Sequence, residues 1–517
     1  MQSNLLQQIH LELGPDGFEP VAQHEGDAST YVREHEEFQR ALLRICPAKV
    51  WPKSCNTSAC PRPVLMGEHH QQQLYEVHEA LTVAVTDIVQ RWWSDADARF
   101  PERMPLEAQE ENLLQWIETQ VLSGRLPEYS KCRGSWRPDF LVEEHRDSEG
   151  KEIGENFRIT EINARFAFNG YMMEAYGQQA LDDMGILARH GLKSAASAEK
   201  YIDGLLGLFR PDLPLHLLKG EEHGMDIHMF IHMVEQRLGV TPRLTTPQDL
   251  RLLPDENGKG GYKLCCVVED GNKGASAAQN PTFSTSNGEL VQEIHQVGLE
   301  LHQHELRALD AEMLRQISLR CFNDMRTILL VHDKRMLGIV KQESALLVKR
   351  RILTTEQALI LDKGIADTVL PNSTDLHELF NKSKCSIELK NEYLLKPIRG
   401  GKGAGILFGE DLSSEEWLNA LDGMRSPGLS AKVIYVIQRR ITPRLYNVVL
   451  RESGEKTSFP LVGTYHSAHG RFLGIGVWRS SGDRICAISY GGAWLCSVIF
   501  QNGMRWPSPA ISTGVNE

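Results

Sequence analysis

Glycines and two lysines gather in KPIRGGKGAGI, residues 396–406, between two strand-like runs. Glycine lets backbone N–H groups come close to a phosphate, and Lys396 and Lys402 would add positive charge to the same group. The stretch is not a Walker A loop, because no Ser or Thr follows its Gly-Lys pair, and it lacks the GxGxxG spacing of a dinucleotide fold. It predicts a phosphate-covering loop, with a flexible hairpin of solvated lysines as the alternative.

Upstream, RPDFLVEE (residues 137–144) and FRITEINARFAF (residues 157–168) flank a polar turn-rich segment and predict a β-hairpin. Strand side chains repeat every two residues, so alternate residues share a face and pairing brings the two sets together. The side chains brought together are those of Arg137, Asp139, Glu161, Asn163 and Arg165. Oxygen ligands of this kind suit Mg²⁺, whereas surface strands with cross-strand ion pairs would explain the same pattern.

The other patterns outline a mixed fold. Helical spacing marks residues 70–93 and 289–318, and residues 326–334, RTILLVHDK, read as a buried strand ending in charge. Residues 186–265 alternate helix-like and strand-like stretches, which indicates an α/β unit with a partly parallel sheet. A Gly/Ser/Asn-rich stretch, residues 271–289, is expected to form a surface loop.

The bulk properties exclude several classes of protein. At 517 residues the chain exceeds the size of a single core, so two or three domains are expected. A net charge of −12 disfavours nucleic acid as a partner. The ten cysteines show no CxxC spacing, and no long apolar run or signal peptide is present, so we expect a cytoplasmic protein without membrane insertion.

The motifs and their order resemble the ATP-grasp ligases in the circularly permuted arrangement of glutathionylspermidine synthetases. Arg137-x-Asp139 and Glu161-x-Asn163 precede the Lys-Gly loop, which is the reverse of the ordinary ATP-grasp order. Asp333-Lys334 is similar to the dipeptide that carries an earlier ATP-contacting lysine. The stretch KVIYVIQRRI, residues 432–441, resembles the strand that faces the adenine.

The resemblance implies ATP and Mg²⁺ as cofactors and assigns roles to the motif residues. The metal ligands would be Asp139, Glu161 and Asn163. The nucleotide would be bound by Lys334, Lys396, Gly400, Gly401, Lys402, Gly403 and Gln438. The catalytic residues would be Arg137, Arg165 and Lys396.

The expected architecture is α+β and α/β: an ATP-grasp fold in permuted order with a pre-ATP-grasp-like α/β domain and a β-rich lid. A helical region and the metal-binding half would occupy residues 1–185, and the pre-ATP-grasp-like domain residues 186–330. Residues 331–440 would hold the nucleotide-binding part and the lid, and residues 441–517 would complete the core.

The function implied is an ATP-dependent carboxylate–amine ligase that forms an amide through an acyl phosphate. Its partners would be small-molecule, amino-acid-like carboxylate and amine substrates, and a homodimer is left open. The alternatives are a small-molecule kinase and a non-catalytic nucleotide-binding protein.

Several further residues could belong to the site or to an ordinary surface. His332 could contact a phosphate or form a strand-end hydrogen bond, and the second interpretation is favoured. The Gly-rich C-terminal segment holds candidates for contact with a carboxylate substrate: His466, His469, Arg479 and Arg484.

Overall fold

The computed structural model describes residues 5–11, 17–22, 27–146, 149–150, 152–224, 226–268, 281–425 and 434–501. Residues 271–280 of the expected surface loop lie outside this range, as do residues 147, 148 and 151 of the hairpin tip. In the described part of the chain, no helix combines the length and apolar character needed to cross a bilayer.

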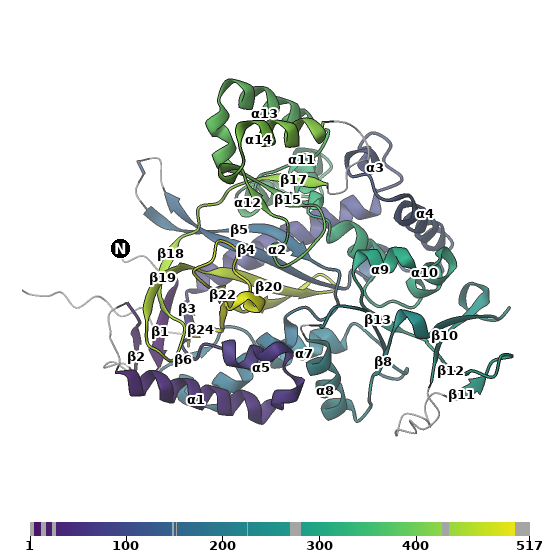
Figure 1. Ribbon diagram of the computed structural model, residues 1–517, viewed down its shortest axis with the longest axis horizontal. Helices are drawn as coiled ribbons and strands as arrows, with labels where there is room; N and C mark the ends of the chain where they lie inside the picture. Colours follow the sequence, from purple (N-terminus) through teal and green to yellow (C-terminus); the bar gives the residue numbers. More distant parts are fainter. Residues whose placement is uncertain are drawn as a thin grey trace, which may run out of the picture.

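A central antiparallel sheet carries the predicted hairpin (Figure 1). Its strand order is β23-β22-β20-β4-β5, with β21 paired to β20. The strands are β4 (Ser135–Arg146), β5 (Glu152–Asn163), β20 (Val462–Ala468), β21 (Arg471–Ile475), β22 (Trp478–Ser480) and β23 (Ala493–Leu495). Arg137 lies opposite Asn163 and Asp139 opposite Glu161, so the predicted pairing of the two motif strands is confirmed.

A second sheet joins segments that are distant in the sequence. Its order is β2-β1-β3-β24-β6, and β24 runs parallel to β3. The strands are β1 (Gln7–Leu11), β2 (Phe18–Pro20), β3 (Val64–Met66), β6 (Leu192–Ser194) and β24 (Ser497–Phe500). The strands near both ends of the described chain therefore share one sheet.

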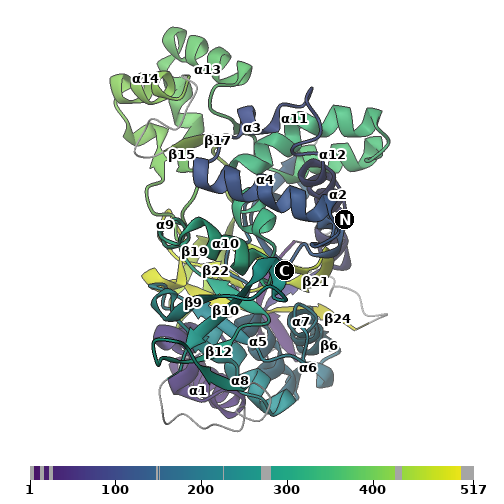
Figure 2. The same cartoon turned by 90° about the vertical axis from the view of Figure 1, so that its right-hand side faces the viewer.

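Amphipathic helices cover these sheets and bury their apolar faces against them. The helices α2 (Glu68–Gln90), α11 (Arg335–Lys349) and α12 (Thr355–Gly364) pack together, and α12 also contacts β5. A second group, in the lower half of Figure 2, packs around α5 (Tyr171–Asp183) and also contains α1 (Ala28–Ile45) and α7 (Ala198–Leu206). The helix predicted over residues 70–93 is thus confirmed as α2.

Residues 186–265, predicted to alternate between helix and strand, contribute two strands to a parallel sheet. The sheet β13-β7-β8 is parallel and contains β7 (His216–Lys219), β8 (Arg243–Thr245) and β13 (Val297–Glu300). The helix α8 (Ile227–Leu238) follows β7 in the chain. A separate antiparallel sheet contains β9 (Leu250–Pro254), β10 (Tyr262–Val267), β11 (Thr282–Ser284) and β12 (Leu290–Glu293).

A small layer above the central sheet carries the Lys-Gly loop (Figures 1 and 2). Its sheet, β14-β17-β15-β16, is made of β14 (Thr368–Val369), β15 (Tyr393–Pro397), β16 (Leu407–Phe408) and β17 (Tyr435–Arg439). The helices α13 (Thr374–Cys385) and α14 (Ser414–Gly423) cover it. Trp417, Phe380 and Leu395 belong to a core of its own, separate from the main core.

Two expectations about secondary structure are wrong. Residues 326–334 form no strand: Thr327–Val331 is a buried π-helical turn that leads into α11. A short run that is apolar on every side does not distinguish a buried strand from a buried helix. Residues 289–318 begin with β12 and β13 before α9 (Gln303–Ala308) and α10 (Ala311–Ser318), so only their second half is helical.

Three further α-helices and one hairpin are added to this outline. They are α3 (Phe100–Arg103), α4 (Ala108–Leu122), α6 (Ile186–Arg189) and the pair β18 (Leu445–Val449) and β19 (Lys456–Pro460). The proposed division into four domains is not tested by this arrangement and stays a prediction.

Candidate active site

One cavity of about 560 Å³ is lined by residues of both the central sheet and the upper layer. The acidic strand pair lines it through Asp139, Glu161 and Asn163, and the Lys-Gly loop lines it through Lys396 and residues 400–403. The two stretches lie more than two hundred residues apart in the chain, yet they face the same space. The fold thus brings together the motifs that the sequence grouped.

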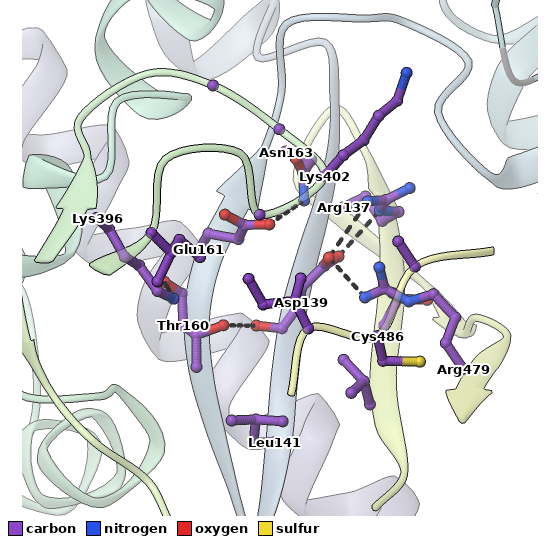
Figure 3. A pocket seen from close by; sticks show the side chains of 18 of the residues that line it. Arg137, Asp139, Leu141, Thr160, Glu161, Asn163, Lys396, Lys402, Arg479 and Cys486 are labelled. Atoms are coloured by element: carbon purple, nitrogen blue, oxygen red, sulfur yellow. Dashed lines mark hydrogen bonds and ion pairs between the residues drawn. The ribbon is translucent and has the colours of Figure 1, made fainter. Parts of the chain in front are cut away.

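Asp139 is held by two arginines at the centre of the cavity wall (Figure 3). Arg137 Nε donates to Asp139 Oδ1 at 3.0 Å, and Arg479 Nη2 donates to Asp139 Oδ2 at 2.7 Å. Thr464 of β20 lies opposite Asp139 of β4, so a strand of the C-terminal segment pairs directly beside the motif strand. The Asp139 side chain is only 6% exposed, and the two guanidinium groups compensate its charge.

Glu161 faces a lysine from the start of α11. Lys334 Nζ lies 3.2 Å from Glu161 Oε2, and Asn163 Nδ2 donates to Glu161 Oε1 at 3.4 Å. Burial alone would raise the pKa of Glu161, but Lys334 and Lys396 outweigh it and lower the pKa to about 2. Glu161 therefore stays ionised throughout the neutral pH range.

Lys396 and Gln438 come from neighbouring strands and meet at one backbone carbonyl. Gln438 Nε2 donates to Thr160 O at 3.2 Å and to Thr368 Oγ1 at 3.1 Å, and Lys396 Nζ lies 3.5 Å from Thr160 O. Burial lowers the pKa of Lys396 to about 8, although Glu161 favours the charged form. A buried ammonium without a close carboxylate is suited to an anionic ligand.

The Lys-Gly loop is fixed from three sides. Lys334 Nζ donates to Gly400 O at 2.7 Å, and Arg399 Nε donates to Asp333 Oδ2 at 3.1 Å. At the tip, Lys402 Nζ lies 3.1 Å from a carboxylate oxygen of Glu222. These contacts hold the loop over the cavity.

Gly403 lets the loop lie against the C-terminal segment. Its φ is +72°, and a Cβ added there would lie 2.3 Å from Ile485 Cγ2. A side chain would therefore strain the backbone and push the loop away from residues 482–489, which line the cavity too. This supports a glycine requirement at this position of the predicted phosphate loop.

Arg165 also lines the cavity, on the side of α9. It is 8% exposed, and its Nη2 donates to Gln303 Oε1 over 3.4 Å. Arg165 therefore lies next to α9, whereas Arg137 lies beside Asp139.

For several residues the sequence did not decide between a role in the site and a structural role. Most of these residues line the cavity. His332 Nδ1 lies 3.3 Å from both Ala164 N and Ile162 O, so the favoured strand-end hydrogen bond is present, although His332 also lines the cavity. Arg479, Arg484 and His466 line the cavity as well. His469 does not: its Nδ1 accepts from Gly134 N in a loop contact.

Some cavity residues escaped the sequence reasoning. Asn169 accepts a hydrogen bond from Arg137 Nη1 at 2.6 Å, and Glu222 and Glu300 line the cavity from the segment 186–330. Asn169 lies beside a glycine at the start of a helix, a local signal that could have drawn attention to it. The two glutamates carry no comparable signal, because their place depends on how distant segments pack.

The oxygen ligands on the cavity wall fit a magnesium ion that also binds phosphates of a ligand. Asp139, Glu161 and Asn163 supply two carboxylates and an amide oxygen on one face, and Mg²⁺ usually takes one or two protein carboxylates plus substrate phosphates and waters. In the described part of the chain, no group of three His, Cys, Asp or Glu side chains forms a preformed metal cage. The residues would therefore bind the ion together with a nucleotide.

Comparison with known proteins places the chain in a family. Residues 77–330 match the family model described as the AnkG N-terminal domain. The chain is 35% identical over 485 residues to the ATP-grasp enzyme ankG of Aspergillus thermomutatus, covering 94% of this chain and 98% of that protein.

A solved structure supports the same fold. The glutathione synthetase-like effector from Globodera pallida, in its apo form, aligns with a TM-score of 0.52 and 11% identity, over 92% of this chain and 98% of that one. At this identity the likeness concerns the fold alone, which is mixed α+β and similar to a glutathione synthetase-like structure. With the close sequence match, it follows that this chain belongs to the AnkG family of ATP-grasp enzymes.

Proposed function

We propose that the protein is a carboxylate–amine ligase of the permuted ATP-grasp type, which uses ATP to form an amide through an acyl phosphate. The observation that carries the proposal is the single cavity shared by the acidic pair Asp139 and Glu161 and by the basic loop with Lys396. Phosphoryl transfer is catalysed mainly by positioning and by compensation of charge, and this cavity supplies both.

The nucleotide would occupy the side of the cavity formed by β15, β17 and the loop. Lys334 and Lys396 would bind its phosphates, and the backbone of Gly400, Gly401, Lys402 and Gly403 would cover them. Gln438, fixed by Thr160 and Thr368, would lie beside the base. Bound Mg²⁺, held by Asp139, Glu161 and Asn163, would neutralise phosphate charge.

Arg137 and Arg479 would stabilise the transferred group. Both guanidinium groups point at Asp139 and line the cavity, so they can move onto phosphoryl oxygens without leaving it. A substrate carboxylate oxygen attacks the γ-phosphorus and ADP leaves. The amine nitrogen then attacks the acyl carbon, phosphate departs, and the amine proton is released.

The loop would protect the intermediate from water. Its contacts through Arg399 and Lys402 close the cavity on the side of the upper layer.

The test is a screen of amino-acid and polyamine pairs for ADP formation, with mass spectrometry of the products. We expect ADP and free phosphate only when an acid and an amine are both present, and a product that has lost one water. If the carboxylate carries labelled oxygen, the label should appear in the released phosphate. ADP formation without an amine, together with a stable phosphorylated product, would identify a kinase instead.

A further inference from the structure

Arg165 is a buried cation with little inside the protein to bind it. Its only hydrogen bond among the described residues is the 3.4 Å contact from Nη2 to Gln303 Oε1, which is long for an N–H donor. Its Nε is buried without a partner, and no described carboxylate lies within ion-pair distance. A buried charge left in this condition is costly unless a ligand completes it.

The other buried arginines show what a satisfied guanidinium looks like in this molecule. Each bonds a carboxylate or, for Arg320, several oxygens of Gln316 and Tyr262. These arginines are Arg62, Arg91, Arg320, Arg326 and Arg335. Among the buried arginines of the described residues, Arg165 is the exception, because it bonds no carboxylate and only one oxygen.

The carboxylates near Arg165 are already committed to another residue. Glu110 and Asp333 both accept hydrogen bonds from Arg399, at 3.1 Å each. Burial and the neighbouring Arg399 lower the pKa of Arg165 to about 10, so the group still carries its charge at neutral pH. The positive charge of Arg165 is therefore present at neutral pH, and Arg165 lines the cavity.

Arg165 is also distinct from the arginines that surround the phosphoryl site. Arg137 and Arg479 bind Asp139, whereas Arg165 lies beside Gln303 of α9. One cavity thus offers two separate positions for oxyanions. The position beside Arg137 and Arg479 suits the substrate carboxylate that is activated. The position beside Arg165 is left for another anionic group of the same substrate.

We propose that the acid substrate is at least dianionic and that Arg165 binds the carboxylate that is not activated. This inference rests on the ligase function proposed above. A guanidinium binds a carboxylate with two parallel hydrogen bonds, which makes it selective for an oxyanion over a neutral amide. Di- and tricarboxylic acids, including acidic amino acids, are the class of substrate that fits.

Hydroxylamine as the amine makes the test independent of the natural nucleophile. The enzyme, ATP and Mg²⁺ are combined with one acid, and the acyl phosphate reacts with hydroxylamine to give a hydroxamate and free phosphate. The panel pairs aspartate with asparagine, glutamate with glutamine and succinate with butyrate, and it includes O-phosphoserine as an anion of another kind. We expect hydroxamate from acids with a second carboxylate and at least about tenfold less from their neutral partners.

Arg165→Gln should remove this preference. We expect kcat/KM for the best dicarboxylate to fall by at least about 30-fold, with KM for ATP changed by less than about twofold. Arg165→Lys should recover part of the loss, since it keeps the charge but not the planar pair of donors. Arg307→Gln on α9, an exposed arginine paired with Glu107, is the matched control and should behave as wild type.

A stability measurement separates this role from a structural one. Removal of an unpaired buried cation should leave the melting temperature unchanged or raise it, whereas loss of a structural arginine lowers it. A marked fall in melting temperature for Arg165→Gln would therefore contradict the proposal.

The remaining outcomes are equally decisive. An equal rise in KM for ATP would assign Arg165 to the nucleotide, and a preference for O-phosphoserine alone would replace the carboxylate by a phosphate. Hydroxamate from monocarboxylates alone would refute the inference and leave the ligase function intact. If no acid gives hydroxamate, the acyl phosphate function fails with it.

Discussion

Arg479 Nη2 donates to Asp139 Oδ2 at 2.7 Å, although 340 positions separate the two residues in the chain. Arg137 binds the same carboxylate from within its own strand. The charge of Asp139 is therefore balanced by one local and one distant guanidinium. The site on β4 is therefore complete only when the C-terminal strands β20 and β22 have joined the same sheet.

Replacement of Asp139 should separate stability from activity. Asp139→Asn leaves Arg137 and Arg479 without their carboxylate, so we expect a loss of about 3 kcal/mol in the free energy of unfolding and at least about 100-fold in ATP turnover. Adding Arg479→Gln should restore part of the stability but none of the activity. Denaturant unfolding and ADP release measure both quantities, with Asp212→Asn, an exposed ion-pair residue, as control. Wild-type ADP release by Asp139→Asn would remove the metal assignment.

Lys396→Met should chiefly weaken nucleotide binding. Among the described residues no carboxylate forms an ion pair with this buried ammonium, although Glu161 favours its charged form, so a bound phosphate would supply its principal partner. We expect the Kd for a non-hydrolysable ATP analogue with Mg²⁺ to rise by at least about 30-fold in calorimetry. Lys382→Met, on the surface of α13, should bind as wild type. An unchanged affinity in Lys396→Met would speak against the loop assignment.

The pKa of Lys396 predicts how activity depends on pH. Burial lowers this pKa to about 8, so the free enzyme carries the positive charge below pH 8 and loses it above. We expect kcat/KM for ATP to fall about tenfold per pH unit above that point. In Lys396→Arg the guanidinium stays charged, and the decline should move to higher pH. A flat wild-type profile up to pH 10 would contradict this role.

The ion pair between Lys402 and Glu222 should contribute only modestly to the affinity for the nucleotide. Lys402 is 47% exposed, and exposed ion pairs contribute about 1 kcal/mol or less. Lys402→Ala and Glu222→Gln should therefore each raise the Kd for the ATP analogue by no more than about fivefold, and the double variant by no more than the larger single effect. A loss as large as that in Lys396→Met would mean that Lys402 binds phosphate directly.

The sequence predicted the parts of the site that depend on local spacing. The period of two in residues 137–139 and 161–163 predicted that Asp139 and Glu161 share a face, because a strand has only two faces, and the structure places them opposite each other. Lys396 was predicted from the glycine-rich stretch between two strand-like runs, and Gln438 from the family resemblance of residues 432–441. Their roles in binding and catalysis stay predictions.

The remaining features of the fold and the site could not be predicted from local spacing. Residues 328–331 are all apolar, so their pattern did not separate a strand from the π-helical turn that forms. The partner of Arg399 on α4 is Glu110, 289 positions away, and the partner of Arg165 on α9 is Gln303, 138 positions away. Such contacts depend on how whole layers of the fold pack together, and the local spacing of apolar and polar residues does not predict that packing.

The parallel pairing of β24 with β3 has a consequence for synthesis of the protein. Val64–Met66 leaves the ribosome early, but its neighbour Ser497–Phe500 follows more than four hundred residues later. The first strands must therefore wait with an unpaired edge, which invites association between nascent chains. We expect a requirement for chaperones during production in a foreign host.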